Sequence, residues 1–236
     1  LNIGQGEGAI FIGYKHNSSK QTKEYNLKVE FNPNKLQDQS LHEDDVNAIQ
    51  KIVFGTLNNV LKGNKRLITG FDVAFDLTVN NTLIVPVSNT GRMQDRHKGT
   101  IYYGNRGKHG YLKMYDKKKE LQEVHKREIS DEDLTRIEYS FRISDGLIIN
   151  DLGKEPIFRI SDLYNFSFID YDSLKGTLKA CVLAYSTGLM DLKEFPRRTK
   201  DNIKNALKDM EQLDLDHALK SNWKNIITDV KQYIQI

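Results

Sequence analysis

The residues best suited to chemistry in this sequence lie between residues 99 and 120. This stretch holds four of the eleven tyrosines, at Tyr102, Tyr103, Tyr111 and Tyr115, and basic side chains lie among them. A tyrosine hydroxyl can act as a covalent nucleophile, and lysine and arginine hold phosphate through charge and hydrogen bonds. The stretch therefore combines groups that can attack a phosphodiester with groups that can hold one. A basic hairpin whose tyrosines merely pack is the alternative interpretation.

Basic charge is concentrated around the same stretch. The 236 residues carry a formal net charge of only +3, yet residues 92–127 hold eleven Lys and Arg against four acids. A local basic surface favours a polyanion as partner. Candidate phosphate contacts are Arg106, Lys108, Lys113, Lys117 and Lys118. A second basic group, which begins a C-terminal helix and could contact duplex DNA, includes Arg197 and Arg198.

Composition is typical of a polar, soluble protein: 38% of residues are hydrophobic and 28% are charged. No apolar run approaches the roughly 18 to 20 residues of a membrane span, and we expect neither a signal peptide nor membrane association. The single cysteine, Cys181, excludes an internal disulfide and gives no zinc-finger pattern. We expect a cytoplasmic protein. Because Leu1 already begins structured sequence, we also expect that upstream residues have been removed.

The elements that must position these residues form an antiparallel sheet followed by helices. Alternating apolar and polar side chains predict strands at residues 8–14, 25–31, 67–79, 100–103, 111–116 and 134–143. Helical apolar spacing predicts helices at residues 42–61, over most of 161–192, and at 202–213 and 217–234. Residues 80–99 are expected to be irregular. This order is an α+β arrangement, with a sheet-based catalytic domain at residues 1–145 and a mainly helical region at 146–236.

Acidic side chains share the polar faces of these strands. Glu30, Asp72, Asp76 and Glu138 each lie opposite an apolar face. Asp72 and Asp76 cannot easily bind one ion together, because residues four apart on a strand are about 13 Å apart. Facing residues on neighbouring strands are only about 5 Å apart, and carboxylates suit Mg²⁺ or Mn²⁺. We therefore expect a divalent-metal site built from acids of different strands, with salt bridges to Arg136 or Lys113 as the alternative.

Tyrosine, carboxylates and a divalent metal together suit phosphodiester transesterification. The metal would polarise the phosphate, and a phenolate would attack it, leaving a phosphotyrosine link and a free 3′-hydroxyl. Because the ordinary pKa of tyrosine is near 10, the metal or Lys113 would have to favour the phenolate. Tyr115 lies on the same strand face as Tyr111 and Lys113. Tyr111 and Tyr103 are the rival nucleophiles.

Four segments occur in the order found in a known family. They are VEFNPNKL (29–36), FDVAFD (71–76), YYGNRGKHGYLKMYDKKKE (102–120) and LTRIEYSFR (134–142). Together they resemble the Rep_trans family, the rolling-circle replication initiators of Gram-positive plasmids, which are related to conjugative relaxases. The likeness spans about residues 25–205. The block ending in YDKK is its most specific part.

The resemblance implies a DNA-nicking enzyme. Tyr115, the tyrosine before the DKK run, would form a 5′-phosphotyrosine link at the plasmid origin and release a 3′-hydroxyl for rolling-circle replication. The resemblance also implies dependence on Mg²⁺ or Mn²⁺, with Asp72 and Glu138 as first choices of ligand and Glu30 and Asp76 as second. The fold would be HUH-like, without the His-hydrophobe-His motif of other nicking enzymes.

Origin DNA, a host helicase and a second copy of the chain are the partners that the resemblance implies. Two alternatives remain open from the sequence. One is a conjugative relaxase with the same chemistry, and the other is a DNA-binding relative that does not cleave.

Overall fold

The protein is described by a computed structural model. The described residues are 2–3, 10–17, 24–32, 51–52, 55–56, 59, 67–92, 94–123, 132–148, 151–153 and 156–234. They belong to two compact units, one of residues 66–224 and one of residues 1–65 with 225–236. Within the described ranges, no helix has both the length and the apolar character of a membrane span.

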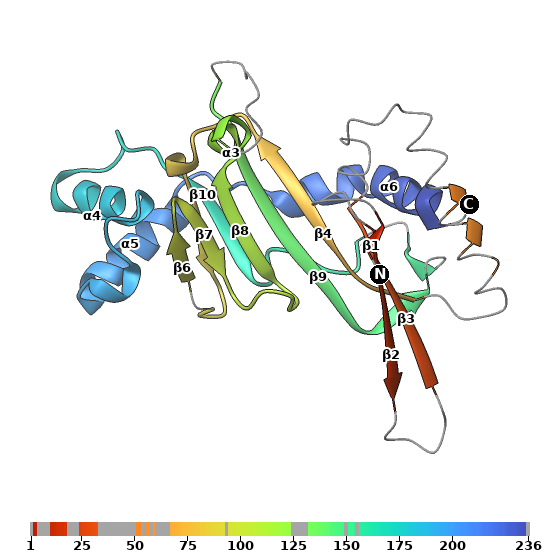
Figure 1. The fold of residues 1–236 in the computed structure, drawn as a ribbon. Coiled ribbons are helices and arrows are strands. Elements are labelled where there is room, and N and C mark those ends of the chain that lie inside the picture. The colour runs from red at the N-terminus through yellow and green to blue at the C-terminus, as the bar shows by residue number, and fades with distance from the viewer. Residues whose placement is uncertain are drawn as a thin grey trace. The chain divides into compact units, whose positions relative to one another are not determined.

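The larger unit is built on a five-stranded antiparallel sheet with the order β4-β9-β8-β7-β6 (Figure 1). Its strands are β4 (Leu67–Leu77), β6 (Gln94–His97), β7 (Thr100–Tyr103), β8 (Tyr111–Asp116) and β9 (Thr135–Ile148). The long strand β9 lies between β4 and β8. It therefore sets the register of the side chains that come from both neighbours.

One face of this sheet is apolar. Leu112 and Met114 of β8 and Ile137 and Tyr139 of β9 are at most 1% exposed. Because successive side chains of a strand point to opposite faces, the residues between them lie on the other, polar face. The alternation predicted from the sequence is confirmed for both strands.

Further elements of this unit pack around the sheet. A second antiparallel sheet pairs β5 (Ile84–Ser88) with β10 (Tyr164–Phe168). The helices of this unit are α3 (Lys117–Glu123), α4 (Gly176–Ser186), α5 (Arg197–Asp209) and the first half of α6 (Leu215–Ile234), with short 3₁₀ turns η2 (Asn81–Leu83) and η4 (Leu192–Glu194).

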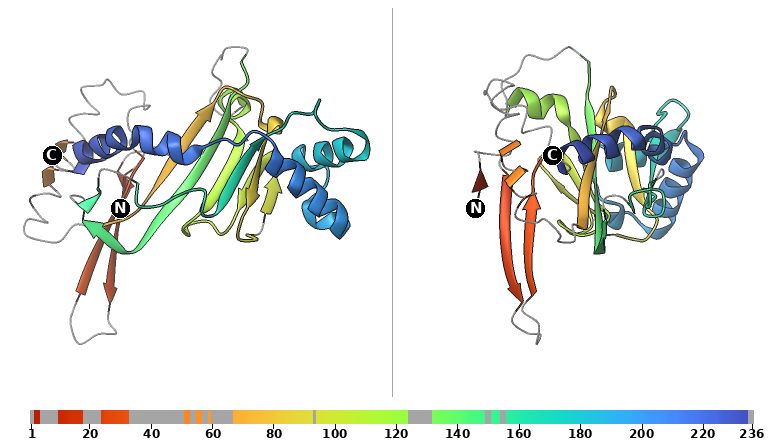
Figure 2. Two further views of the ribbon diagram at one scale, coloured as in Figure 1. Left: turned by 180° about the vertical axis from the view of Figure 1, so that it is seen from behind. Right: turned by 90° about the vertical axis from the view of Figure 1, so that its right-hand side faces the viewer.

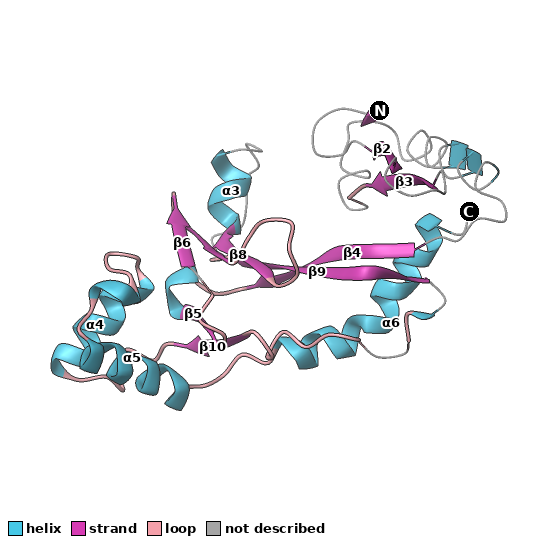
Figure 3. Ribbon diagram, turned by 90° about the horizontal axis from the view of Figure 1, so that it is seen from below, coloured by secondary structure: helices cyan, strands magenta, loops and turns pink. Residues whose placement is uncertain are grey.

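Figure 3 shows β5, β10 and this half of α6 on one side of the sheet and α3 on the other. In the rear view of Figure 2, residues 215–224 of α6 pass over β4 and β9. There Trp223, 1% exposed, packs on Phe71 with 5.8 Å between ring centroids. The polar face carries α3 alone among the described helices of this unit.

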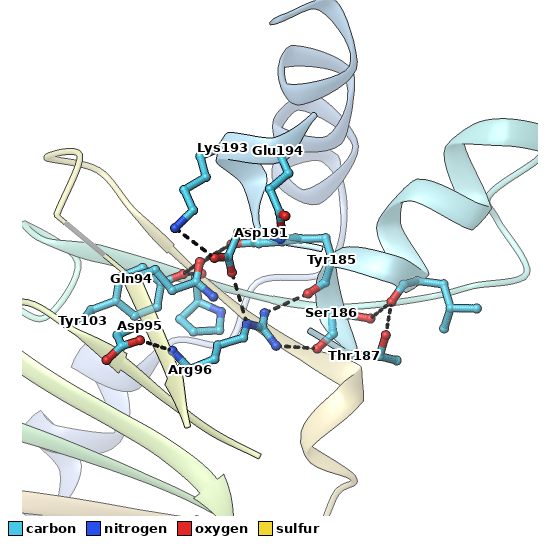
Figure 4. Close-up of polar contacts among 12 residues, drawn as sticks. Gln94, Asp95, Arg96, Tyr103, Tyr185, Ser186, Thr187, Asp191, Lys193 and Glu194 are labelled. Carbon is cyan, nitrogen blue, oxygen red and sulfur yellow. Dashed lines mark hydrogen bonds and ion pairs between the residues drawn. The ribbon is translucent and has the colours of Figure 1, made fainter. Parts of the chain in front are cut away.

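Arg96 ties the edge strand β6 to the end of α4 (Figure 4). Its guanidinium donates to the carbonyl oxygens of Tyr185 at 2.7 Å and Ser186 at 3.2 Å. It also lies 4.0 Å from the carboxylate of Asp191 and 5.6 Å from the centre of the Tyr185 ring. The last carbonyls of a helix lack intrahelical partners and attract cations. Arg96 therefore satisfies the end of α4 while fastening it to the sheet.

Replacing this guanidinium should cost stability. We expect Arg96→Met to lower the free energy of unfolding by about 2 kcal/mol, because it removes two charge-assisted hydrogen bonds from a mostly buried position. The corresponding fall in melting temperature is about 4–8 °C, measurable by circular dichroism. Arg159→Met, at an exposed position, is the matched control. Equal melting temperatures for the two variants would contradict the role of Arg96.

The smaller unit contains the antiparallel strands β1 (Asn2–Ile3), β2 (Ile10–Asn17) and β3 (Glu24–Glu30), in the order β1-β2-β3. β2 and β3 correspond to the predicted strands at residues 8–14 and 25–31. The predicted helix at residues 42–61 falls mostly outside the described residues, and its described positions 51–52, 55–56 and 59 are helical.

The α+β class is confirmed, while two local predictions are wrong. Residues 80–99 contain η2, β5 and β6 rather than irregular chain, and residues 161–192 contain the strand β10 and a shorter helix α4. The expected division at residue 145 falls inside β9. The assignment of catalysis to residues 1–145 and of packing and DNA recognition to residues 146–236 stays a prediction.

Candidate active site

Polar side chains from three strands gather on the open face of the central sheet. The register sets Tyr115 opposite Arg136, and Lys113 opposite Glu138. On the other side of β9, Ala74 lies opposite Glu138, with Asp72 and Asp76 two residues away in either direction. The face thus has Glu138 at its centre, with the tyrosine on one side and the acids of β4 on the other.

Tyr115, Glu138 and Lys113 are in direct contact. The Tyr115 hydroxyl donates a hydrogen bond of 2.8 Å to Oε1 of Glu138. The Lys113 ammonium lies 3.5 Å from Oε2 of the same carboxylate and 4.0 Å from the centre of the Tyr115 ring. A candidate nucleophile is therefore hydrogen-bonded to a candidate base, and a cation contacts both. This is the geometry expected of an activated nucleophile.

Tyr115 keeps its proton in this arrangement. Burial raises the pKa of its hydroxyl well above the ordinary value, and the hydrogen bond to Glu138 and the charge of Glu138 raise the pKa further. The residue is 6% exposed, with the ammonium groups of Lys113 and Lys117 beside its ring. A phenolate at this position would therefore require transfer of the proton to an adjacent base.

Both aspartates of β4 form salt bridges with arginines of β9. Arg136 makes two hydrogen bonds of 2.6 Å to the carboxylate of Asp76, and Arg142 makes one of 2.7 Å to Asp72. A bidentate arginine–carboxylate pair is strong and geometrically specific. Salt bridges, the expected alternative to a metal site, are thus observed for both aspartates. The partner of Asp72 is Arg142 rather than Arg136.

These acids do not form a ready metal site. Among the described residues, no three His, Cys, Asp or Glu side chains are placed to hold one ion. Asp72 and Asp76 would each have to release an arginine, and Glu138 is already hydrogen-bonded to Tyr115. The fourth expected ligand, Glu30, belongs to the smaller unit, where it is exposed and pairs with Lys28. As folded, the donor set does not fit a divalent ion.

The candidate phosphate contacts differ in exposure. Arg106 and Lys108 are exposed in the turn between β7 and β8, and Arg197 and Arg198 are exposed at the start of α5. Lys118 is half-buried. Lys117 is 8% exposed and forms an ion pair with Glu120. Its ammonium therefore lies near the Tyr115 ring rather than on the open surface.

The rival tyrosines are placed differently from Tyr115. Tyr103 is 3% exposed, on the core side of the sheet, and its hydroxyl donates to the carbonyl of Pro86 at 2.7 Å. Burial raises the pKa of Tyr103 well above its usual value. Tyr111 lies on the polar face, but among the described residues its hydroxyl has no carboxylate partner. Tyr115 alone of the three has an adjacent base.

The sequence points to Glu138 as a metal ligand but not as the acceptor of the Tyr115 proton. The two residues are 23 positions apart, and a shift of one residue in the β8–β9 register would separate them. Alternation does place both on polar faces, which is the only signal in the sequence. The missing information was which residue of β9 lies beside which residue of β8.

The sequence matches the Phage_CRI family, described as the N-terminal part of a replication-associated protein, over residues 15–140. The match covers more than half of the chain and includes β4, β6, β7, β8 and part of β9. The chain therefore belongs to this family, and the predicted resemblance to rolling-circle replication initiators is confirmed.

Three similar curated proteins from Staphylococcus aureus are each named replication initiation protein. One is 26% identical over 231 residues, covering 91% of this chain and 65% of its own length. The other two are 24% and 25% identical and are covered to 65% and 68% of their lengths. The chain thus spans about two thirds of the length of these relatives.

Proposed function

We propose that this protein initiates rolling-circle replication by nicking one strand of plasmid origin DNA. The observation that carries the proposal is the 2.8 Å hydrogen bond from the Tyr115 hydroxyl to the Glu138 carboxylate, in a chain of a replication-associated family. Basic side chains at the β7–β8 turn supply charge for the DNA backbone on the same hairpin.

The proposed reaction is a transesterification. The Tyr115 oxygen attacks the phosphorus of one phosphodiester while its proton passes to Oε1 of Glu138. The new bond joins tyrosine to phosphorus, and the bond from phosphorus to the 3′ oxygen breaks. The products are a 5′-phosphotyrosine link and a strand with a free 3′-hydroxyl.

Lys113 completes the proton path in this proposal. Its ammonium gives a proton to the departing 3′ oxygen and regains one from Glu138, which lies 3.5 Å away. The same charge stabilises the phenolate as it develops over the 4.0 Å contact with the ring. An incoming phosphate would meet the Lys113 ammonium beside the Tyr115 ring, and its negative charge is attracted to that ammonium.

One assay tests the proposal directly. Supercoiled plasmid carrying the cognate origin is incubated with the protein, stopped with detergent, and examined for open circles and for a protein–DNA adduct. We expect both products, with the adduct attached to the 5′ side of the nick. DNA binding without nicks or adduct would favour the non-cleaving alternative and contradict the proposal.

Divalent-ion dependence is a separate proposal that rests on the family resemblance. We expect EDTA to lower the nicking rate on the order of 10²–10³-fold, in keeping with the charge stabilisation that a metal supplies, and Mg²⁺ or Mn²⁺ to restore it. Full nicking in EDTA would contradict the proposed metal dependence but would not contradict the proposed tyrosine chemistry. Because no metal site is formed among the described residues, we assign the metal no step.

Origin DNA is the proposed macromolecular substrate. Recruitment of a host helicase, formation of a homodimer and a cytoplasmic location are proposed on the resemblance to plasmid initiators. Arg197 and Arg198 are proposed contacts to duplex DNA, because they are exposed in the first turn of α5.

A further inference from the structure

Two tyrosine rings on the polar face take no part in the proposed proton path. Tyr102 of β7 and Tyr111 of β8 have ring centroids 6.3 Å apart and planes inclined by only 21°. Both residues are half-buried. Among the described residues, neither hydroxyl makes a hydrogen bond. The pair therefore presents aromatic surface whose packing and polar partners inside the protein are incomplete.

Other tyrosines of the sheet show what packing alone produces. Tyr103 and Tyr139 lie on the apolar face, at 3% and 0% exposure, in contact with the ring of Tyr164. Tyr102 and Tyr111 instead lie on the face that the described helices α4, α5 and α6 leave open. Their placement is unlike that of core residues, so a role toward a ligand is a better explanation.

The register aligns this ring pair with Tyr115. Tyr102 lies opposite Lys113, while Tyr111 precedes Lys113 by two residues and Tyr115 follows it by two. Tyr111 and Tyr115 are therefore about 13 Å apart along β8, which a stacked nucleic-acid strand crosses in about four nucleotides. Exposed Arg106 and Lys108 flank the Tyr111 end. Along β8 an aromatic ring, a lysine and the proposed nucleophile thus follow one another, and the second ring lies beside them on β7.

We infer that Tyr102 and Tyr111 form a stacking platform for unpaired bases of the DNA strand whose phosphodiester reaches Tyr115. Aromatic side chains bind single strands because each base has a free π-face, and basic groups hold the backbone alongside. In duplex DNA both faces of a base are covered by its neighbours, so the platform selects unpaired DNA. The inference rests on the proposed function and specifies its substrate as single-stranded around the nick.

The test uses binding to a DNA that cannot be cut. In a Tyr115→Phe background, affinity is measured by anisotropy with a short oligothymidylate carrying one 2-aminopurine, whose fluorescence falls when it stacks. We expect Tyr111→Leu and Tyr102→Leu each to weaken binding between about 5-fold and 100-fold and to restore 2-aminopurine fluorescence. The Tyr111→Phe and Tyr102→Phe proteins, which keep the rings, should bind and quench like the background.

A duplex of the same length is the control, and its affinity should be unchanged in the leucine proteins. Leucine fills most of the space of the ring in a strand, and melting curves verify that each variant is folded. Equal single-strand affinity for the leucine and phenylalanine proteins would overturn the platform, as would unquenched 2-aminopurine in the background protein. Both readouts are independent of cleavage, so they stay valid even if Tyr115 proves not to be the nucleophile.

Discussion

Replacing Tyr115 by phenylalanine should abolish the protein–DNA adduct and lower the nicking rate by at least about 10⁴-fold, as expected when a nucleophile is removed. The change deletes one oxygen, the atom that donates to Glu138 at 2.8 Å. The ring stays in its buried position beneath Lys113. DNA binding should therefore survive. The measurements are adduct formation on denaturing gels and open-circle formation on supercoiled origin plasmid.

Tyr139→Phe is the matched control for this loss. Tyr139 is fully buried, and its hydroxyl has no hydrogen-bond partner in the described part of the chain. Removing that oxygen should leave nicking unchanged. It should also leave stability equal or slightly higher, because an unsatisfied buried polar group is itself unfavourable. An adduct of normal yield from the Tyr115→Phe protein would exclude Tyr115 as nucleophile.

The faces of the strands were predictable because alternation depends only on neighbouring residues. Burial of Leu112 and Met114 on one side, and the positions of Tyr111, Lys113 and Tyr115 on the other, follow from the two-residue period of a strand. The same argument holds for β9, where Ile137 and Tyr139 are buried as expected. Fold class and the candidate nucleophile thus needed only local pattern and a motif.

Contacts between distant strands were not predictable, since they depend on register. The pairing of Lys113 with Glu138 brings two segments together, and no local pattern specifies it. The same limitation concealed Arg142 as the partner of Asp72 and left the salt bridge to Arg136 only an alternative, although both arginines turn expected metal ligands into ion pairs.

Two of the missed strands, β5 and β10, were missed for another reason. β5 contains Pro86, which lacks a backbone donor and usually argues against a strand. β10, with the sequence YNFSF, lies only a short distance before the helix α4, which begins at Gly176. Among the described strands β5 pairs with β10 alone, so β5 has an edge at which a proline is tolerated, while the other edge of β10 bridges to Gln212. Short strands of this kind carry too few residues for a clear periodic signal.

Glu138→Gln is the second decisive change, because it removes the proposed base while keeping its shape. We expect the nicking rate to fall by about 10²–10⁴-fold, the usual contribution of general base catalysis. DNA affinity should be equal or higher, since a negative charge is lost beside the DNA-binding face. Glu123→Gln, an exposed acid of α3, is the control and should nick at the normal rate.

The pH dependence of the glutamine variant separates a base from a metal ligand. Burial, the largest cause of the raised pKa of Tyr115, persists in this variant, so the phenolate fraction grows about tenfold per pH unit across the accessible range. Single-turnover nicking by Glu138→Gln should therefore rise with that slope between about pH 7 and 9.5. The wild-type rate, in which Glu138 accepts the proton, should depend on pH less steeply.

A metal-ligand role for Glu138 predicts a different rescue. A weakened metal site would recover activity as Mn²⁺ is raised at constant pH, whereas a missing base would not. We expect no recovery with Mn²⁺ and a unit slope with pH, because the carboxylate contacts the tyrosine hydroxyl directly and the acids on either side of it are held by Arg136 and Arg142. Recovery with Mn²⁺ and a flat pH profile would identify Glu138 as a metal ligand rather than the base. Lys113 would then be the residue that activates Tyr115.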